Sequence, residues 1–212
     1  MELYFSPLAC SMATRIALYE AGSGATYLEV DSKTKTVLKD GSDFRKVNPL
    51  GLVPTLRTDD GVVLTENAAI LQYVADRYPA APLAPPAGMD RSRLQQWLCF
   101  IGTELHKTLF VPRLDAKAPE VVKTYALEKG ERAMAYLNDY LSGREYLLNR
   151  FSVADAYLFT VLNWSTAASV DLERWPAVRD YYSRMRQRPC IGKALGEERA
   201  LYVEQQSRRK AA

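Results

Sequence analysis

The stretch MELYFSPLACSMATRIALYEAG, residues 1–22, decides how the chain begins to fold. Residues 2–6 form a short β-prone run that Pro7 ends, and from about Ser11 the apolar residues recur at helical spacing until Gly22. This order predicts a strand, a loop and a helix. Cys10 lies in the loop, immediately before the expected helix.

A cysteine at the start of a helix can be chemically reactive. The first N–H groups of a helix are unpaired and carry a partial positive charge, which stabilises a thiolate. We therefore interpret Cys10 as a working thiol, and the alternative is a buried, inert side chain. Three positions on, the chain has Ala13 instead of a resolving cysteine, so a redox reaction at Cys10 needs an external thiol such as glutathione.

The rest of the N-terminal third continues the alternation of strands and helices. Further strands are predicted at 26–30, 52–56 and 62–64, and a further helix at 66–78. Asp59-Asp60-Gly61 is a hairpin turn between the last two strands. A crossover between the first two strands and a hairpin between the last two predict a four-stranded mixed sheet with helices against it.

A proline-rich segment, PAAPLAPP at 79–86, ends this region, because such a segment cannot continue a helix. The chain after it is predicted to be helical throughout. One apolar stripe comprises Leu94, Trp97, Leu98, Ile101, Leu105 and Leu109, and a second comprises Val122, Tyr125, Ala126, Ala133, Leu137, Tyr140 and Leu141. The predicted division is an α/β domain at 1–79, a linker at 80–87 and an all-α domain at 88–212.

The composition and net charge argue against a nucleic-acid or membrane partner. The chain of 212 residues is 48% hydrophobic and 25% charged, as in ordinary globular proteins. Its net charge is only +3, so we expect no nucleic-acid partner, and the basic run at 208–210 is interpreted as a solvated terminus. No apolar run approaches the roughly 20 residues that span a bilayer, and signal-peptide features are missing, so we expect no membrane association and a cytoplasmic location.

The number and spacing of the cysteines and the single histidine argue against a metal site. The three cysteines are widely spaced and odd in number, which is typical of a reducing compartment. Together with one histidine they offer no ligand cluster, so we expect no metal.

Two further local features suggest binding of an extended peptide. Val53-Pro54, before the third strand, is a candidate cis bond that leaves the Val53 backbone free to pair with a ligand. At Thr65-Glu66-Asn67 the helix N–H groups can hold a carboxylate and Glu66 can hold an ammonium. The alternative there is structural, with Thr65 as the helix N-cap and Glu66 as a first-turn acid.

Taken together, the chain resembles the glutathione transferase superfamily, most closely its bacterial beta class. The resemblance covers essentially the whole chain and rests on motifs at 3–11, 48–54, 64–70, 104–107 and 151–158. It implies a thioredoxin-like N-terminal domain that binds glutathione, an all-helical C-terminal domain that binds the hydrophobic co-substrate, and a homodimer. Within the last motif, Ser152 and Asp155 form a predicted capping box, whose role is in folding.

The resemblance also implies the site residues. Cys10 corresponds to the residue at the glutathione sulfur, where it can hydrogen-bond to the thiolate, orient it or form a mixed disulfide. Val53 pairs with the cysteinyl unit, Glu66 and Asn67 hold the γ-glutamyl end, and Lys35 lies near the glycyl carboxylate. The other implied glutathione contacts are Ala9, Ser11, Leu52, Pro54, His106 and Lys107.

His106, the only histidine, is the second implied catalytic residue, near Cys10 across the domain boundary. On a regular α-helix it is offset from the stripe of Leu98, Ile101 and Leu105. It is expected to share a face with Cys99 and Thr103. That face is expected to line the active-site cleft.

The chain also departs from the pattern of the beta class. Leu8 stands where the class commonly has glycine, Asn67 where many relatives have a smaller residue, and Cys99 where an asparagine of the second subunit can face glutathione. Cys99 is either a second redox thiol or part of the packing. The co-substrate pocket is expected to include Leu8, Phe110 and Trp164.

The predicted activity is conjugation of reduced glutathione to small hydrophobic electrophiles, a detoxifying reaction. One alternative is a glutathione-dependent thiol-disulfide reductase in which Cys10 forms the mixed disulfide. The other is a non-catalytic binding protein that has kept the fold.

Overall fold

Four short strands form one sheet in the N-terminal part of the chain. They are β1 (Glu2–Phe5), β2 (Thr26–Glu29), β3 (Thr55–Arg57) and β4 (Val63–Thr65), in the order β2-β1-β3-β4. β1 is parallel to β2 and antiparallel to β3, and β3 is antiparallel to β4. The predicted four-stranded mixed sheet is confirmed in this computed structural model, which describes residues 1–211.

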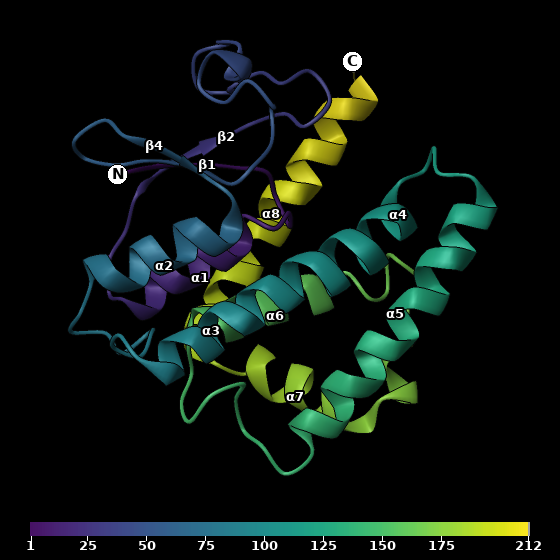
Figure 1. The fold of residues 1–212 in the computed structure, drawn as a ribbon. Coiled ribbons are helices and arrows are strands. Elements are labelled where there is room, and N and C mark those ends of the chain that lie inside the picture. The colour runs from purple at the N-terminus through teal and green to yellow at the C-terminus, as the bar shows by residue number, and fades with distance from the viewer. Residues whose placement is uncertain (212) are drawn as a thin grey trace. The chain divides into compact units, whose positions relative to one another are not determined.

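Helices α1 (Met12–Glu20) and α2 (Asn67–Arg77) pack side by side on one side of the sheet (Figure 1). The C-terminal helix α8 (Pro189–Ala211) packs against α1. Between β2 and β3 the chain forms a single turn of 3₁₀-helix, η1 (Phe44–Lys46). Its Phe44 is fully buried and stacks on Tyr4 of β1, with ring centroids 5.4 Å apart.

The two faces of the sheet are covered by different parts of the chain because side chains alternate along a strand. Tyr4 lies in a cluster with Leu28, Val30, Val37 and Phe44 on the side of the loop that follows β2. Its neighbours along β1, Leu3 and Phe5, therefore point to the opposite face.

The middle of the chain is helical. Its elements are α3 (Met89–Phe100), η2 (Ile101–Phe110), α4 (Val111–Leu114), α5 (Glu120–Leu141), α6 (Val153–Leu162), η3 (Leu172–Arg174) and α7 (Pro176–Arg186). η2 is a π-helix, with hydrogen bonds from residue i+5 to residue i, and continues directly from α3. The sequence pattern predicts an ordinary α-helix there.

The first predicted apolar stripe, from Leu94 to Leu109, is buried along its whole length. The second stripe is wrong at its start, because Val122 and Tyr125 are exposed (41% and 58%). Helical spacing alone therefore does not bury the first turns of α5.

Helix α6 begins with the predicted capping box. Asp155 is fully buried and accepts hydrogen bonds from the N–H and the hydroxyl of Ser152 (2.9 and 2.8 Å). It also accepts from the N–H of Leu147 and the hydroxyl of Tyr181. One carboxylate therefore joins α6, α7 and the loop before α6.

The described residues divide into two units. The first comprises residues 1–83 with α8, and the second comprises Ala84–Arg188. The division falls inside the predicted linker 80–87, but α8 belongs by its contacts to the first unit. The domain ranges 1–79, 80–87 and 88–212 stay a prediction, and residue 212 lies outside the described residues.

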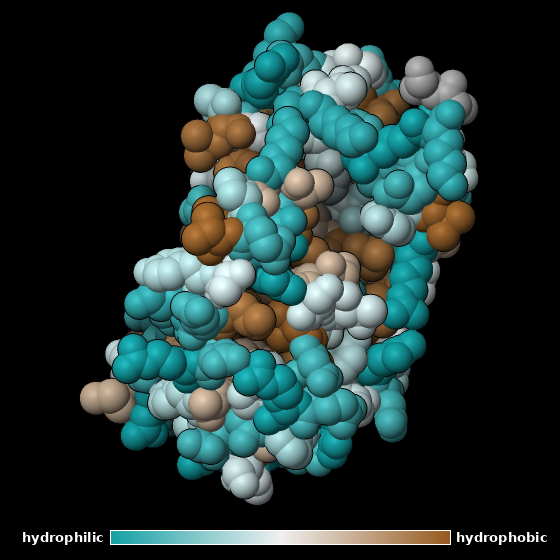
Figure 2. Space-filling view, turned by 90° about the vertical axis from the view of Figure 1, so that its right-hand side faces the viewer, coloured by the Kyte–Doolittle hydropathy of each residue, from teal (hydrophilic) through white to brown (hydrophobic). Residues whose placement is uncertain are grey.

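The surface is mostly hydrophilic on the face shown in Figure 2, where hydrophobic side chains lie in separate patches. Exposed apolar residues include Leu50, Val121 and Val203, each more than 60% exposed. Among the described helices, we find none with the length and apolar character needed to cross a bilayer.

Candidate functional site

The loop between β1 and α1, which carries Cys10, is held by the hydroxyl of Ser11. This hydroxyl donates to the carbonyl of Ser6 (3.3 Å) and accepts from the N–H of Ser6 (3.4 Å). Ser6 Oγ in turn donates to the carbonyl of Val30 over 2.6 Å. Ser11 is the N-cap of α1, so Cys10 is the residue before the cap and lies in the loop at the start of the helix, as the sequence pattern predicts.

The thiol of Cys10 is half-buried and lies against the loop that precedes β3. Its Sγ donates to the carbonyl of Val53 over 3.2 Å. The Val53–Pro54 bond, a candidate cis bond from the sequence, is cis. The fold therefore brings together two predicted site residues that lie 43 positions apart in the chain.

Asn48 gives the loop before β3 its shape. The buried Asn48 side chain donates to the carbonyl of Leu52 (2.8 Å) and to Thr55 Oγ1 (3.1 Å), and it accepts from the N–H of Leu50. Gly51 has a φ of +61°, a conformation that L residues rarely adopt.

Lys35 reaches the same loop from the segment after β2. A Cβ added to Gly51 would lie 3.2 Å from Cδ of Lys35, so the lysine side chain passes directly over this glycine. Lys35 itself has a φ of +61°, and its backbone is held by hydrogen bonds to Asp31 and Phe44. Lys35 therefore lies beside the loop that carries Val53, and its contact with the glycyl carboxylate stays a prediction.

Glu66 and Asn67 lie at the start of α2, directly after β4. Glu66 is the N-cap residue, so the structural alternative with Thr65 as N-cap is wrong. Glu66 has a φ of +65°, which is costly for a residue with a Cβ, and its exposed side chain makes no capping bond. The Asn67 side chain is 5% exposed, and its Oδ1 has no hydrogen-bond partner among the described residues.

The backbone of Leu8 is bound by Glu198, a residue that the sequence pattern does not single out. Leu8 has a φ of +59°, which explains why glycine suits this position, and its N–H donates to Glu198 Oε2 over 2.7 Å. Glu198, on α8, is fully buried and also accepts from Nε of Arg15 at 3.0 Å. Burial raises the pKa of Glu198 to about 7, and Arg15 and the Leu8 amide partly oppose that rise.

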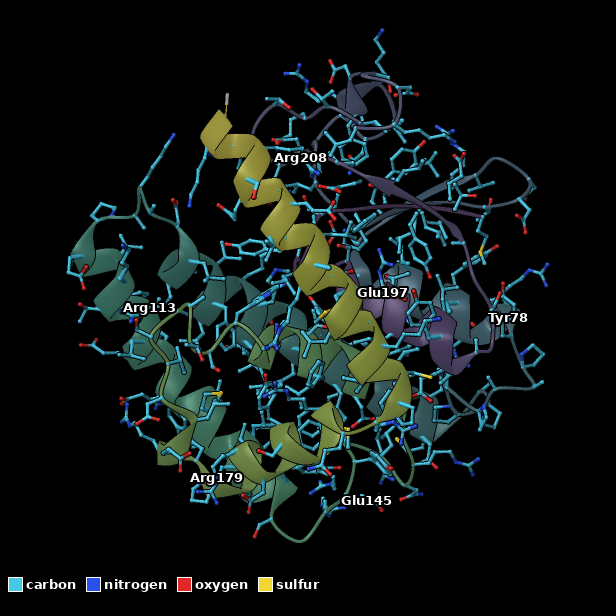
Figure 3. All side chains as sticks on the ribbon, turned by 180° about the vertical axis from the view of Figure 1, so that it is seen from behind. Tyr78, Arg113, Glu145, Arg179, Glu197 and Arg208 are labelled. Carbon is cyan, nitrogen blue, oxygen red and sulfur yellow. The ribbon has the colours of Figure 1, made fainter. Side chains whose placement is uncertain are left out.

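α8 supports this region at further points along its length. Arg15 also pairs with Glu197, and Arg208 pairs with Glu29 on β2; Glu197 and Arg208 are labelled on α8 in Figure 3. Arg209 donates to the hydroxyl of Ser32. The arginines of the basic terminus therefore bind the strand-loop region of their own unit, which corrects their interpretation as a merely solvated end.

His106 lies on η2 in the second unit and is buried, with 7% of its surface exposed. Nδ1 of its ring is 2.7 Å from the hydroxyl of Tyr157, and its ring centroid is 5.0 Å from that of Trp164. Burial and the charge of Lys107 lower the pKa of His106 to about 4. Its imidazole is therefore neutral at pH 7.

The predicted shared face of His106, Cys99 and Thr103 is wrong, because Cys99 and Thr103 are exposed whereas His106 is buried. In a π-helix the hydrogen-bonded neighbour is five residues away, which turns His106 toward the side of Ile101 and Leu105. The expectation that His106 lies near Cys10 stays a prediction.

Comparison with known proteins decides the family. Residues 9–77 match the family described as glutathione S-transferase, N-terminal domain, and residues 96–189 match its C-terminal domain. The chain is 40% identical over 200 residues to glutathione S-transferase GstA of Escherichia coli O157:H7, covering 93% of this chain and 98% of the relative. The chain belongs to the glutathione S-transferase family.

Two solved glutathione S-transferases support the same assignment. A sphingomonad glutathione S-transferase complexed with glutathione is 43% identical, with a TM-score of 0.88 over 93% of this chain and 98% of that one. The bacterial beta-class enzyme of Sphingomonas chungbukensis is 42% identical, with the same TM-score and the same coverage of both chains. The predicted superfamily, the likeness to the beta class, the fold class and the enzyme class are confirmed.

In this glutathione S-transferase the fold gathers most of the predicted glutathione contacts in one unit. Cys10, Val53 and Lys35 meet at the loop before β3, and Ala9, Ser11, Leu52 and Pro54 are their neighbours in sequence. No local pattern in the sequence points to Glu198, and Tyr157 stands out only as a member of the motif at 151–158, because the partners of both side chains lie far away in the chain. Among residues 1–211, we find no group of three or more His, Cys, Asp or Glu side chains placed to hold a metal ion.

Proposed function

We propose that this glutathione S-transferase conjugates reduced glutathione to small hydrophobic electrophiles, with Cys10 and His106 as its catalytic residues. The observation that carries the proposal is the position of Cys10. Its thiol lies at the start of α1 and 3.2 Å from the Val53 carbonyl, the backbone that an extended tripeptide would pair with.

In this proposal glutathione lies extended along the loop before β3. A carbonyl oxygen has two lone pairs, so Val53 can accept a glutathione N–H as well as the Cys10 thiol. Glu66 and Asn67 hold the ammonium and carboxylate of the γ-glutamyl end, and Lys35 binds the glycyl carboxylate. The unpartnered Oδ1 of Asn67 and the uncommitted Glu66 carboxylate support these roles, since buried or strained groups without partners commonly mark ligand sites.

The remaining proposed contacts are secondary. Ala9, Ser11, Leu52 and Pro54 contribute backbone and shape around Cys10 and Val53. Lys107, next to His106, adds positive charge that favours a thiolate and also lowers the pKa of His106.

The reaction is a nucleophilic attack by the glutathione sulfur. The sulfur forms a new bond to an electrophilic carbon, and the leaving group departs with the bonding electrons. When glutathione is bound, Cys10 turns its single S–H from the Val53 carbonyl to the glutathione thiolate and orients that thiolate for attack.

The pKa of His106 determines what its side chain can do. Moving a proton from a thiol of pKa about 8.5 to a base of pKa about 4 costs roughly 6 kcal/mol. His106 is therefore a hydrogen-bond donor to the thiolate, and the thiol proton leaves to solvent.

The proposed co-substrate is aromatic or otherwise apolar. Phe110 and Trp164, which the resemblance assigns to the co-substrate pocket, are both buried, with ring centroids 6.0 Å apart, and Trp164 also contacts the His106 ring. Aromatic walls bind flat apolar electrophiles by surface burial and edge contacts. A chlorinated nitrobenzene is a suitable first substrate.

Substitution of Cys10 tests the proposal. We expect Cys10→Ala to lower kcat/KM for conjugation at least about tenfold, because the thiolate loses its orienting hydrogen bond. Cys10→Ser is the matched control, since a hydroxyl keeps the donor but cannot form a disulfide. Conjugation that survives in both variants, with loss of the reduction of a glutathione mixed disulfide, would favour the reductase instead.

Binding of glutathione tests the remaining alternative, a non-catalytic protein. We expect glutathione at a hundredfold above its Kd to raise the melting temperature by about 5 °C. No shift at millimolar glutathione would contradict the whole proposal.

We further propose that the protein is a cytoplasmic homodimer with no nucleic-acid or membrane partner. Among the described residues no cysteine forms a disulfide, as suits a reducing compartment, and the terminal arginines bind their own chain. Light scattering of the purified protein measures the oligomeric state, and a monomer would contradict the dimer.

A further inference from the structure

The imidazole of His106 is hydrogen-bonded to a phenol. The hydroxyl of Tyr157 lies 2.7 Å from Nδ1 of His106, and both residues are buried, at 3% and 7% exposure. The two rings meet edge to face at 5.9 Å. This is a short, buried hydrogen bond between residues 51 positions apart.

Tyr157 is held rigidly. It lies on α6, in which every residue is buried and whose first turn is tied by the capping box of Ser152 and Asp155. The Tyr157 hydroxyl also lies beside Gly102, one turn before His106 on η2, where an added Cβ would be 3.7 Å away. The backbone of α6 therefore fixes where the phenol meets the imidazole.

The direction of this hydrogen bond follows from acid-base chemistry. The neutral imidazole has one N–H and one nitrogen lone pair, and the phenol has one O–H. A phenol is a stronger acid than a neutral imidazole N–H, and the imidazole nitrogen is a stronger base than a phenol oxygen. The arrangement with the phenol as donor is therefore the more stable one, and it makes Nδ1 the acceptor.

We propose that Tyr157 is a positioning residue that donates to Nδ1 of His106 and thereby holds the imidazole proton on Nε2. The Nε2–H is then permanently available as a donor, and the ring cannot rotate without breaking the bond at Nδ1. The inference rests on the proposed function for the use of that donor, the stabilisation of the glutathione thiolate. The tautomer itself depends only on the geometry within the helical unit.

The single histidine makes a direct test possible. In protein labelled with ¹⁵N-histidine, every imidazole signal belongs to His106. Long-range ¹H–¹⁵N correlation spectra at pH 7 distinguish a protonated ring nitrogen from an unprotonated one. We expect the wild type to show only the tautomer protonated at Nε2, and a spectrum with the proton on Nδ1 would overturn the proposal without any variant.

Tyr157→Phe then tests the cause. We expect this variant to give a mixture of the two tautomers and to lower kcat for conjugation roughly tenfold with little change in KM for glutathione, the effect of one lost hydrogen bond. Tyr140→Phe is the matched control, because the Tyr140 hydroxyl donates to the Leu147 carbonyl in the same unit. An unchanged tautomer in Tyr157→Phe would refute the role of Tyr157.

His106→Ala separates this inference from the proposed function. Wild-type activity in His106→Ala would contradict the catalytic role of His106 and leave the tautomer result intact. If His106→Ala and the double variant with Tyr157→Phe lose activity equally, the two residues act as one unit.

Discussion

Acidification from pH 7 to pH 5 provides a quantitative test of the environment of His106. In the folded chain its pKa is about 4, whereas an unperturbed histidine has a pKa of 6.5. The unfolded state therefore binds a proton at pH values where the folded state does not. His106 stabilises the fold above pH 6.5, and this contribution is lost progressively as the pH falls from 6.5 toward 4.

The magnitude follows from the two pKa values. At pH 5 an unfolded His106 is almost fully protonated and a folded one is about one-tenth protonated. The resulting difference in the free energy of unfolding is about 2 kcal/mol at pH 5 and only ~0.2 kcal/mol at pH 7. Most of the effect therefore appears within these two units of pH.

The assay compares urea unfolding of the wild type and His106→Gln at both pH values. Tryptophan fluorescence reports on the helical unit, because Trp97, Trp164 and Trp175 all lie in it. The side-chain oxygen of glutamine can still accept a hydrogen bond from the Tyr157 hydroxyl, but glutamine does not titrate. We expect the wild type to lose about 2 kcal/mol more than the variant between pH 7 and pH 5.

Only the difference in the free energy of unfolding between the two proteins isolates the contribution of His106. Glu198 changes that free energy with pH in the opposite direction. The pKa of Glu198 is raised to about 7, so its protonation favours the fold at low pH and that contribution is lost as the pH rises from 4.5 through 7. The Glu198 contribution is common to both proteins and cancels. Equal losses in the wild type and His106→Gln would refute the burial argument for His106.

Three further tests by substitution address the fold. Leu8→Gly should be about 1 kcal/mol more stable than Leu8→Ala, because only glycine relaxes at a φ of +59°; urea unfolding of the pair shows this, and equal stabilities would contradict it. Gly130→Ala should destabilise by ~2 kcal/mol, since its Cβ would lie 2.5 Å from Leu109 Cδ1, whereas Gly196→Ala, in open space, should cost nothing. Asp155→Ala should destabilise by at least about 3 kcal/mol, because it leaves buried donors of three residues unpaired; a melting temperature within 2–3 °C of the wild type would argue against this.

The local features of this protein are readable from its sequence. The four strands, the loop at Cys10 and the capping box at Ser152 depend on periods of 2 and 3.6 and on turn residues, which are properties of neighbours in the chain. The cis bond at Val53-Pro54 is flagged by the same local chemistry. The motifs that carry these features also carry the resemblance to glutathione transferases.

Tertiary structure alone decided what surrounds the reactive groups. The position of Glu198 under Leu8, the bond from Tyr157 to His106 and the passage of Lys35 over Gly51 join residues that no local pattern connects. The π-helical hydrogen bonding of η2, which buries His106 instead of exposing it, likewise has no signature in the spacing of apolar residues. Pairing energies between distant segments are settled only when the segments pack, and they set the pKa and the orientation on which the chemistry depends.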